Sequence, residues 1–328
     1  MSLLRKIMRD VWPLPKIEFQ SLAEIEERRP ALLVTSPPAW RAVGSHLNLS
    51  IAAHIEVGEA TRAHWDHLLS SIESRDLEVV YAVGGGLPAD ASKYLAVKLG
   101  LPLICLPSAL SVDAFFTWAS GIREDGCVYY QETKPPDTLI VDFDIIAAAP
   151  ESIRAAGICD VLSIATGAWD WKFAEELGKN PQGMEFVPWI YDNAQSILRG
   201  ALDCAKAAGL GDPAGLKQLC DCLALEVQLC NQISHSRPEE GSEHYFAYCA
   251  ENLISPAWPH ADLLGLGILI MAQQQGQDVA PLERALRCCN IPLDRLSRHH
   301  IEETLRQLPN YVQHHNLPYG IAHERRRK

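Results

Sequence analysis

The segment SRPEEGSEHYFAYCAENL, residues 236–253, concentrates groups that could do chemistry. Several carboxylates surround His244 in what is otherwise the start of an ordinary helix. An imidazole among carboxylates can hold a divalent metal or transfer a proton. The same residues also fit a polar histidine with no chemical role. Residue types alone therefore leave the function of His244 open.

A second candidate is the triple glycine Gly84, Gly85 and Gly86. It follows the apolar run VVYAV and precedes LPADASKYLAVKLG, which has a helical pattern. Because glycine lacks a Cβ atom, a phosphate can approach the backbone, and the helix N-terminus adds a favourable dipole. The order strand, glycine turn, helix suits a dinucleotide pyrophosphate. The spacing is not GxGxxG, however, and a plain tight turn would look the same.

The elements that must position these groups alternate in the first half of the chain. Short apolar runs bounded by turn residues indicate strands, and apolar residues at helical spacing indicate helices. Strands are expected over 31–36, 47–56, 77–83, 101–109 and 137–146, and helices over 40–47, 61–75 and 87–100. Strands joined by helices predict parallel pairing with crossovers, and hence an open α/β sheet.

After about residue 150 the pattern becomes helical, with no strong strand signal. Helices are expected over 150–177, 187–209, 214–233, 242–253, 260–276 and 296–315. We therefore predict an α/β domain over residues 1–150 and an all-α domain over residues 151–328. The cleft between the two domains is the expected place for the active site.

Composition limits the class of protein. The formal net charge of −12 over 328 residues argues against non-specific nucleic-acid binding. The ten cysteines are scattered without CxxC pairs, which indicates reduced thiols rather than a thiolate zinc site. The N-terminus lacks a signal-peptide pattern, and the run LLGLGILIMA is shorter than the ~20 residues that span a bilayer. These features predict a cytoplasmic protein, with an exposed basic tail, that binds neither nucleic acid nor membrane.

Several motifs together resemble one family. GGGLPADASK is similar to the GGGxxxDxxK segment of the iron-containing (polyol) alcohol dehydrogenase superfamily, which includes dehydroquinate synthase. AAAPESIRAAGICD and SRPEEGSEH resemble the sn-glycerol-1-phosphate dehydrogenase branch, and PHADLLGLG is similar to the family helix that opens with His-Gly-Glu. The motifs run in the family order from about residue 30 to residue 280. The resemblance implies a Rossmann-like N-terminal domain and a helical, metal-binding C-terminal domain.

The resemblance also implies a metal site and a reaction. The family's one acid and two histidines fall on Asp160, His244 and His260. Such a set suits zinc above all, and also iron or nickel. A divalent metal lowers the pKa of a substrate hydroxyl, and NAD or NADP accepts hydride at C4. The implied activity interconverts a small polyol or polyol phosphate and its ketone. The choice of metal, the choice between NAD and NADP, and self-association of the chain stay open.

The remaining family positions bear on cofactor and substrate. Asp113 matches the substrate-side aspartate, and Arg237 is expected to hold a phosphate. An Asp113 that merely caps a helix is the alternative. The residues expected to bind the cofactor are Ser36, Gly84, Gly85, Gly86, Asp90, Ser108 and Ser111.

This sequence departs from the family pattern at several positions. Ser36 replaces the aspartate that holds the adenosine ribose, which relaxes discrimination against NADP. Val112, Ile164 and Trp169 replace family residues on the substrate side, and Glu239 with Glu240 partly cancels the positive field of Arg237. Two other functions therefore stay open: a sugar-phosphate cyclase or lyase of the dehydroquinate synthase type, and a non-catalytic protein that binds nucleotide or metal.

Overall fold

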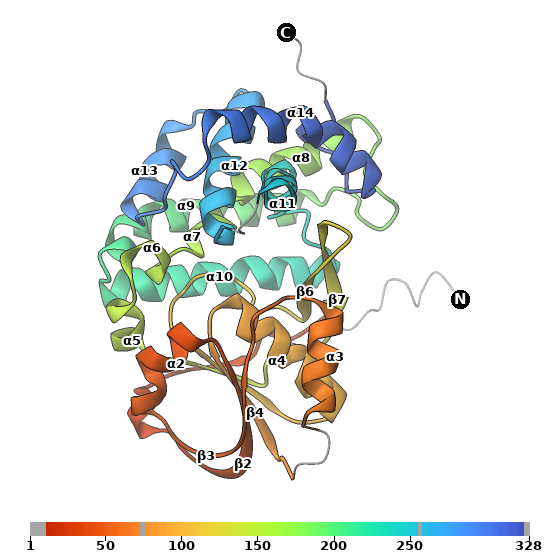
Figure 1. The fold of residues 1–328 in the computed structure, drawn as a ribbon. Coiled ribbons are helices and arrows are strands. Elements are labelled where there is room, and N and C mark those ends of the chain that lie inside the picture. Colours follow the sequence, from red (N-terminus) through yellow and green to blue (C-terminus); the bar gives the residue numbers. More distant parts are fainter. Residues whose placement is uncertain (1–10, 73–75, 255–257, 325–328) are drawn as a thin grey trace.

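The computed structural model describes residues 11–72, 76–254 and 258–324. A part that contains the main sheet lies below a part made of helices (Figure 1). The sheet is parallel, with six strands in the order β1-β8-β5-β4-β2-β3. The strands are β1 (Lys16–Phe19), β2 (Glu26–Thr35), β3 (Asn48–Glu56), β4 (Val79–Gly84), β5 (Leu103–Pro107) and β8 (Thr138–Val141). The predicted fold class, a parallel α/β sheet followed by helices, is confirmed.

The strand order creates a switch point between β2 and β4. From β2 the chain moves outward to β3, then returns to pair β4 on the other side of β2. Where the connections that follow two neighbouring parallel strands lead to opposite sides, the carboxyl ends of those strands leave a crevice in which a ligand can bind. Ser36 follows β2 there, and the triple glycine follows β4.

The helices of the sheet part are α2 (Pro37–Val43), α3 (Arg62–Ser70), α4 (Gly86–Leu99) and α5 (Phe143–Ala148), with 3-10 turns η1 (Leu22–Glu24) and η2 (Gly44–His46). Two of these helices, α3 and α4, lie where the sequence predicts them, whereas α2 begins and ends earlier than the expected 40–47 and α5 was not predicted. The prediction of a single strand over 137–146 was partly wrong. The strand ends at Val141, because the Asp142 carboxylate accepts from the backbone N–H groups of Asp144 and Ile145 and so starts α5.

One hairpin of the sheet part was not predicted from the sequence. Strands β6 (Ala119–Glu124) and β7 (Cys127–Glu132) pair antiparallel outside the main sheet. Their two-residue loop is Asp125-Gly126, with φ angles of 52° and 74°. An Asp-Gly pair with positive φ is the preferred two-residue hairpin turn. The signal was therefore present in the sequence.

The helical part stacks its longest helices on one another. Its helices are α6 (Glu151–Arg154), α7 (Ile158–Leu162), α8 (Ile164–Glu176), α9 (Pro188–Gly209), α10 (Pro213–Ile233), α11 (Ser242–Leu253), α12 (His260–Gln274), α13 (Ala280–Cys288), α14 (Arg298–His314) and the 3-10 turn η3 (Ile321–His323). Helix α13 was not predicted. In Figure 1, α10 runs along the boundary between the helices and the sheet part.

The single helix predicted over 150–177 was wrong, because the chain breaks it into α6, α7 and α8. A loop from the sheet part enters the first break. Arg154 O accepts from Leu110 N–H at 3.0 Å, and Leu110 O accepts from Gly157 N–H at 2.8 Å. A Cβ at Gly157 would lie 3.0 Å from Leu110 O, so only glycine admits this approach. The break joins the two parts of the molecule.

One continuous core runs through both parts. It includes Leu32 and Val80 of the sheet together with Leu263 and Ile268 of α12, all fully buried. A smaller core covers the other face of the sheet, around Leu33 and Tyr81. Within the described ranges, we find no helix of sufficient length and apolar character to cross a membrane. The basic tail expected at 325–328 lies outside the described residues.

Candidate metal centre and cofactor loop

Three residues far apart in the sequence converge between the helices. Asp160 comes from α7, His244 from α11 and His260 from α12. Each offers a ligand atom, and these atoms all lie within 4.8 Å of one another. The family resemblance had paired these residues, and the fold brings them together. Asp160 and His244 are buried, and the two histidine rings lie 5.5 Å apart between centroids.

Neighbouring groups orient two of these side chains. His244 Nδ1 lies 2.9 Å from Glu243 Oε1, which also accepts the Gly241 N–H at 2.6 Å. Because Glu243 engages Nδ1, the Nε2 atom of His244 is left for a metal. Asp160 Oδ2 accepts the backbone N–H of Asp113 at 2.9 Å. The Glu243 carboxylate therefore orients the His244 imidazole.

The three groups of the metal-free triad have strongly shifted pKa values. Burial, with Asp113 nearby, raises the pKa of Asp160 to about 8. Burial lowers the pKa of His244, but the Glu243, Glu240 and Asp160 carboxylates outweigh it and raise that pKa to about 9. Burial and the neighbouring His244 lower the pKa of His260 to about 3. Near neutral pH, the metal-free Asp160 and His244 thus hold protons that a metal would displace, whereas His260 is neutral.

The donor set fits a divalent transition metal. One carboxylate and two imidazoles are ligands of zinc and of iron, and three protein ligands leave coordination positions for water or substrate. A partner carboxylate on one imidazole is the usual support of such a site.

The glycine loop packs closely against its neighbours. Gly84 has φ of +142°, and a Cβ there would lie 3.0 Å from Pro88 Cγ. A Cβ on Gly85 would lie 3.2 Å from Ser111 Oγ, and one on Gly86 would lie 3.0 Å from Val112 Cγ2. The loop leads directly into the N-terminus of α4, the kind of place where a phosphate binds. The binding of a dinucleotide pyrophosphate at this cradle, residues 84–86, stays a prediction.

Comparisons with known proteins agree with this geometry. The iron-containing alcohol dehydrogenase family model matches residues 18–150. A glycerol-1-phosphate dehydrogenase [NAD(P)+] of Pyrococcus horikoshii is 27% identical, over 80% of this chain and 76% of its own length. One from Hyperthermus butylicus is 29% identical, over 83% of this chain and 78% of its own length.

Solved structures share the fold along almost the whole chain. A probable glycerol dehydrogenase from Sinorhizobium meliloti has a TM-score of 0.67 at 18% identity, over 96% of this chain and 93% of its own. A sulfoacetaldehyde reductase from Bifidobacterium kashiwanohense, in complex with NAD+, has a TM-score of 0.63 at 17% identity, over 96% of each chain.

The chain therefore resembles iron-containing alcohol dehydrogenases, by the family model over residues 18–150 and by these glycerol-1-phosphate dehydrogenases over most of its length.

The other residues expected to bind the cofactor fall into two groups. Ser36 and Ser111 lie beside the glycine loop or the switch point, and Ser108 donates its backbone N–H to Gly84 O at 3.1 Å. Asp90, which is partly exposed, instead forms an ion pair with the buried Lys93, at 2.9 Å between Oδ1 and Nζ. Lys93 Nζ also donates to Ala114 O at 3.0 Å, so this pair ties α4 to the 108–118 loop.

The two expected substrate residues occupy different surroundings. Asp113 lies against the metal triad through its backbone N–H. Arg237 is only 2% exposed and donates through Nη2 to Tyr319 O at 2.7 Å. Its Nε and Nη1 have no hydrogen-bond partner within the described part of the chain. The structure therefore gives Arg237 a contact near η3, and its role toward a phosphate stays a prediction.

A buried carboxylate near Asp113 was missed from the sequence. Glu226, on α10, brings an oxygen within 4.8 Å of oxygens from Asp113 and Glu239. The missed signal was a charged residue on an apolar helical stripe, because Leu223 and Cys230 flank Glu226 at helical spacing and are buried. A carboxylate at such a position needs a partner.

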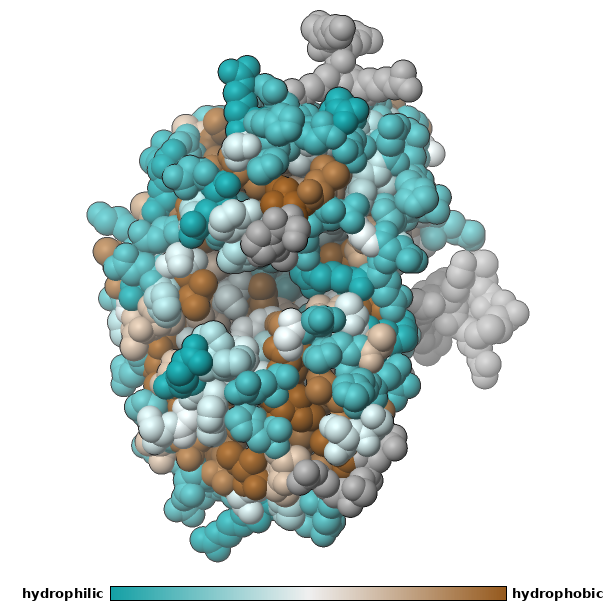
Figure 2. Space-filling model, viewed as in Figure 1, coloured by the Kyte–Doolittle hydropathy of each residue, from teal (hydrophilic) through white to brown (hydrophobic). Residues whose placement is uncertain are grey.

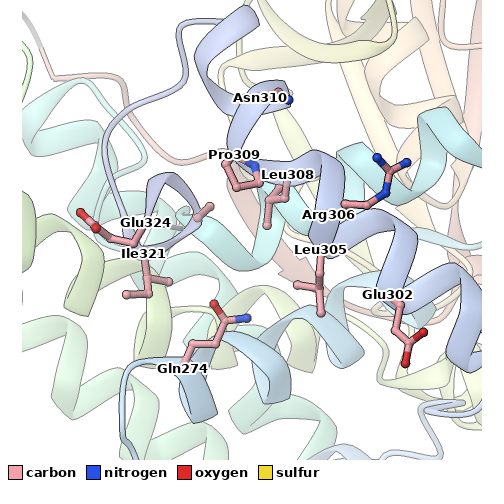
Figure 3. A pocket seen from close by; sticks show the side chains of 10 residues that line it. Gln274, Glu302, Leu305, Arg306, Leu308, Pro309, Asn310, Ile321 and Glu324 are labelled. Atoms are coloured by element: carbon pink, nitrogen blue, oxygen red, sulfur yellow. The ribbon is translucent and has the colours of Figure 1, made fainter. Parts of the chain in front are cut away.

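Two grooves lie near the helical part. One is lined by residues that include Arg123, Val128 and Tyr248, and the Tyr248 ring stacks 6.3 Å from that of His260, which is not part of the lining. The other runs under α14 and η3 between Gln274, Leu305 and Ile321 (Figure 3) and contains none of the triad. Figure 2 shows a hollow on one face between the helical and sheet parts.

Proposed function

We propose that the chain is a metal-dependent NAD(P) oxidoreductase that interconverts a polyol or polyol phosphate and its ketone. The observation that carries the proposal is the 108–113 loop, which touches both halves of the site. Ser111 Oγ faces Gly85 of the cofactor cradle, and Asp113 N–H binds Asp160 of the metal triad. A nicotinamide that follows the pyrophosphate would thus extend toward the metal.

Each group has a defined task in this reaction. The divalent metal, zinc above iron or nickel, supplies Lewis acidity that lowers the pKa of a substrate hydroxyl. Asp160, His244 and His260 hold that metal, and Glu243 fixes the His244 ring. Asp113 offers a carboxylate beside the triad that accepts a hydrogen bond from a substrate hydroxyl. Burial raises the pKa of Asp113 to about 6, so it is poised to exchange a proton near neutral pH.

The relatives' names point to glycerol 1-phosphate as the substrate. The carboxyl groups of Asp113, Glu226 and Glu239, which lie beside the triad, offer no positive charge to a phosphate, and Arg237 directs its Nη2 to Tyr319 O. We therefore include unphosphorylated polyols in the substrate class. Ser36 at the end of β2 places no carboxylate against a 2′-phosphate, so both NADH and NADPH are expected to serve.

The test is a turnover assay with defined metal content. Metal-loaded protein is mixed with NADH or NADPH and with dihydroxyacetone phosphate, dihydroxyacetone or related ketones, and the loss of absorbance is followed. We expect turnover of at least one ketone, and loss of metal with retained NADH binding in His244→Ala. No turnover across the panel, with metal and cofactor both bound, would refute the proposal. Tightly held NAD+ without net turnover would favour the cyclase type instead.

A further inference from the structure

We propose that Asp113, Glu226 and Glu239 form a second cation site, beside the metal triad, for a hard divalent ion such as Mg²⁺ or Mn²⁺. Their carboxylate oxygens lie within 4.8 Å of one another. The three residues come from separate segments: the loop after β5, the buried face of α10, and the turn before α11. This site goes beyond the proposed dehydrogenase function and does not depend on it.

Glu226 is the observation that calls for a ligand. Its side chain is 2% exposed, and neither carboxylate oxygen has a hydrogen-bond partner among the residues that the structure describes. A buried carboxylate without a partner costs several kcal/mol, so native proteins pair it with a cation or a proton donor. The Glu226 side chain is directed at the carboxylates of Asp113 and Glu239.

Glu239 is likewise buried and has an unpaired oxygen, whereas both oxygens of the adjacent Glu240 are hydrogen-bonded. Glu239 is 9% exposed, and its Oε2 has no partner within the described part of the chain. The adjacent Glu240 is satisfied: its Oε2 accepts from Ser236 Oγ at 2.5 Å and its Oε1 from Tyr248 OH at 2.9 Å. Unpaired buried oxygens thus occur on two of the three carboxylates of the cluster, those of Glu226 and Glu239, and also on Glu243 beside the triad.

The nearby protein cations are already engaged. Lys93 and His244 act on Asp113 through their charges, but the Lys93 ammonium is bound to Asp90 and to backbone oxygens, and His244 Nδ1 lies against Glu243. Burial and mutual repulsion accordingly raise the pKa of Glu226 and Glu239 well above the usual range. A bound cation would let these groups ionise.

The donor set selects the type of ion. Three carboxylates and no imidazole or thiolate suit hard ions that prefer oxygen, whereas the neighbouring triad suits zinc. The two sites adjoin, because the backbone N–H of Asp113 binds Asp160 while its carboxylate joins the cluster. A cation there would supply positive charge beside the triad.

The experiment counts Mn²⁺ on the full chain after the triad has been filled. Metal-free protein is loaded with Zn²⁺, desalted and assayed for zinc, and then titrated with Mn²⁺ while free Mn²⁺ is read by electron paramagnetic resonance. We expect one further Mn²⁺ per chain, which excess Mg²⁺ displaces. Glu226→Gln and Glu239→Gln are each expected to weaken Mn²⁺ binding at least about tenfold.

Matched variants separate this site from the triad and from misfolding. Glu240→Gln changes the satisfied neighbour and should bind Mn²⁺ like the wild type. His260→Ala should lose zinc and keep the second site. Retained zinc and an unchanged melting temperature show that Glu226→Gln and Glu239→Gln are folded. No Mn²⁺ bound by zinc-loaded wild type, or wild-type binding by both folded glutamine variants, would overturn the proposal.

Discussion

Two histidines nine residues apart show how local contacts decide protonation. Glu243 and its neighbours raise the pKa of His244 to about 9. At His235, burial together with the Arg237 charge lowers the pKa to about 4. The His235 ring packs edge-on against Trp171, and its Nδ1 accepts the Arg237 backbone N–H at 3.3 Å. His235 is therefore a neutral, structural imidazole, whereas His244 belongs to the charged site.

The neutral state of His235 makes stability depend on pH. Between pH 6.5 and about 4 the unfolded chain binds a proton that the folded chain does not, so stability falls as pH falls. The loss from this group is at most about 3 kcal/mol, reduced by solvent screening. His235→Asn keeps an acceptor for Arg237 N–H and removes the titration. Urea unfolding should show a smaller loss on acidification in the variant, and equal losses would contradict this assignment.

Helices and strands were predicted from the sequence more accurately than the breaks and the tertiary contacts between them. Helix α4 was expected to end at Gly100, and Gly100 does cap it, with φ of +67°. The split of residues 150–177 into three helices could not be predicted, because it depends on Leu110, which the fold brings from a distant loop. The triad was predicted only through the family resemblance, since Asp160, His244 and His260 are paired by tertiary contacts. The Glu226 cluster has the same origin and was missed.

The turn between β4 and α4 offers an element-scale test of cofactor binding. Gly85 has φ of −99°, which alanine also adopts, but a methyl group there would lie 3.2 Å from Ser111 Oγ. Gly85→Ala should weaken NADH binding by about tenfold, or ~1.4 kcal/mol, because the pyrophosphate cannot approach as closely. Calorimetric titration measures the affinity. Gly58→Ala, whose added Cβ meets nothing within 4 Å, is the control. Unchanged affinity in Gly85→Ala would show that this turn does not hold the cofactor.

At the scale of the whole molecule, the two parts share their stabilising contacts. One apolar core contains sheet and helix residues alike, and Leu110 bonds bridge the first helical break. Within the helical part, the triad draws on three helices, because Asp160, His244 and His260 come from α7, α11 and α12. A metal that binds only the folded arrangement would therefore stabilise these three helices at once.

This continuity predicts how metal removal affects unfolding. Zinc at about 100 times its dissociation constant stabilises the folded state by ~2.7 kcal/mol. For a chain of this length that corresponds to roughly 4 °C in melting temperature. Calorimetry should show one transition for both forms, shifted down as a whole when zinc is removed, and no zinc-dependent shift in His244→Ala. Two transitions, of which zinc moves only one, would instead mean that the sheet part and the helical part unfold separately. The shared core couples the two parts only if the unfolding of one exposes apolar surface that the other needs to stay folded.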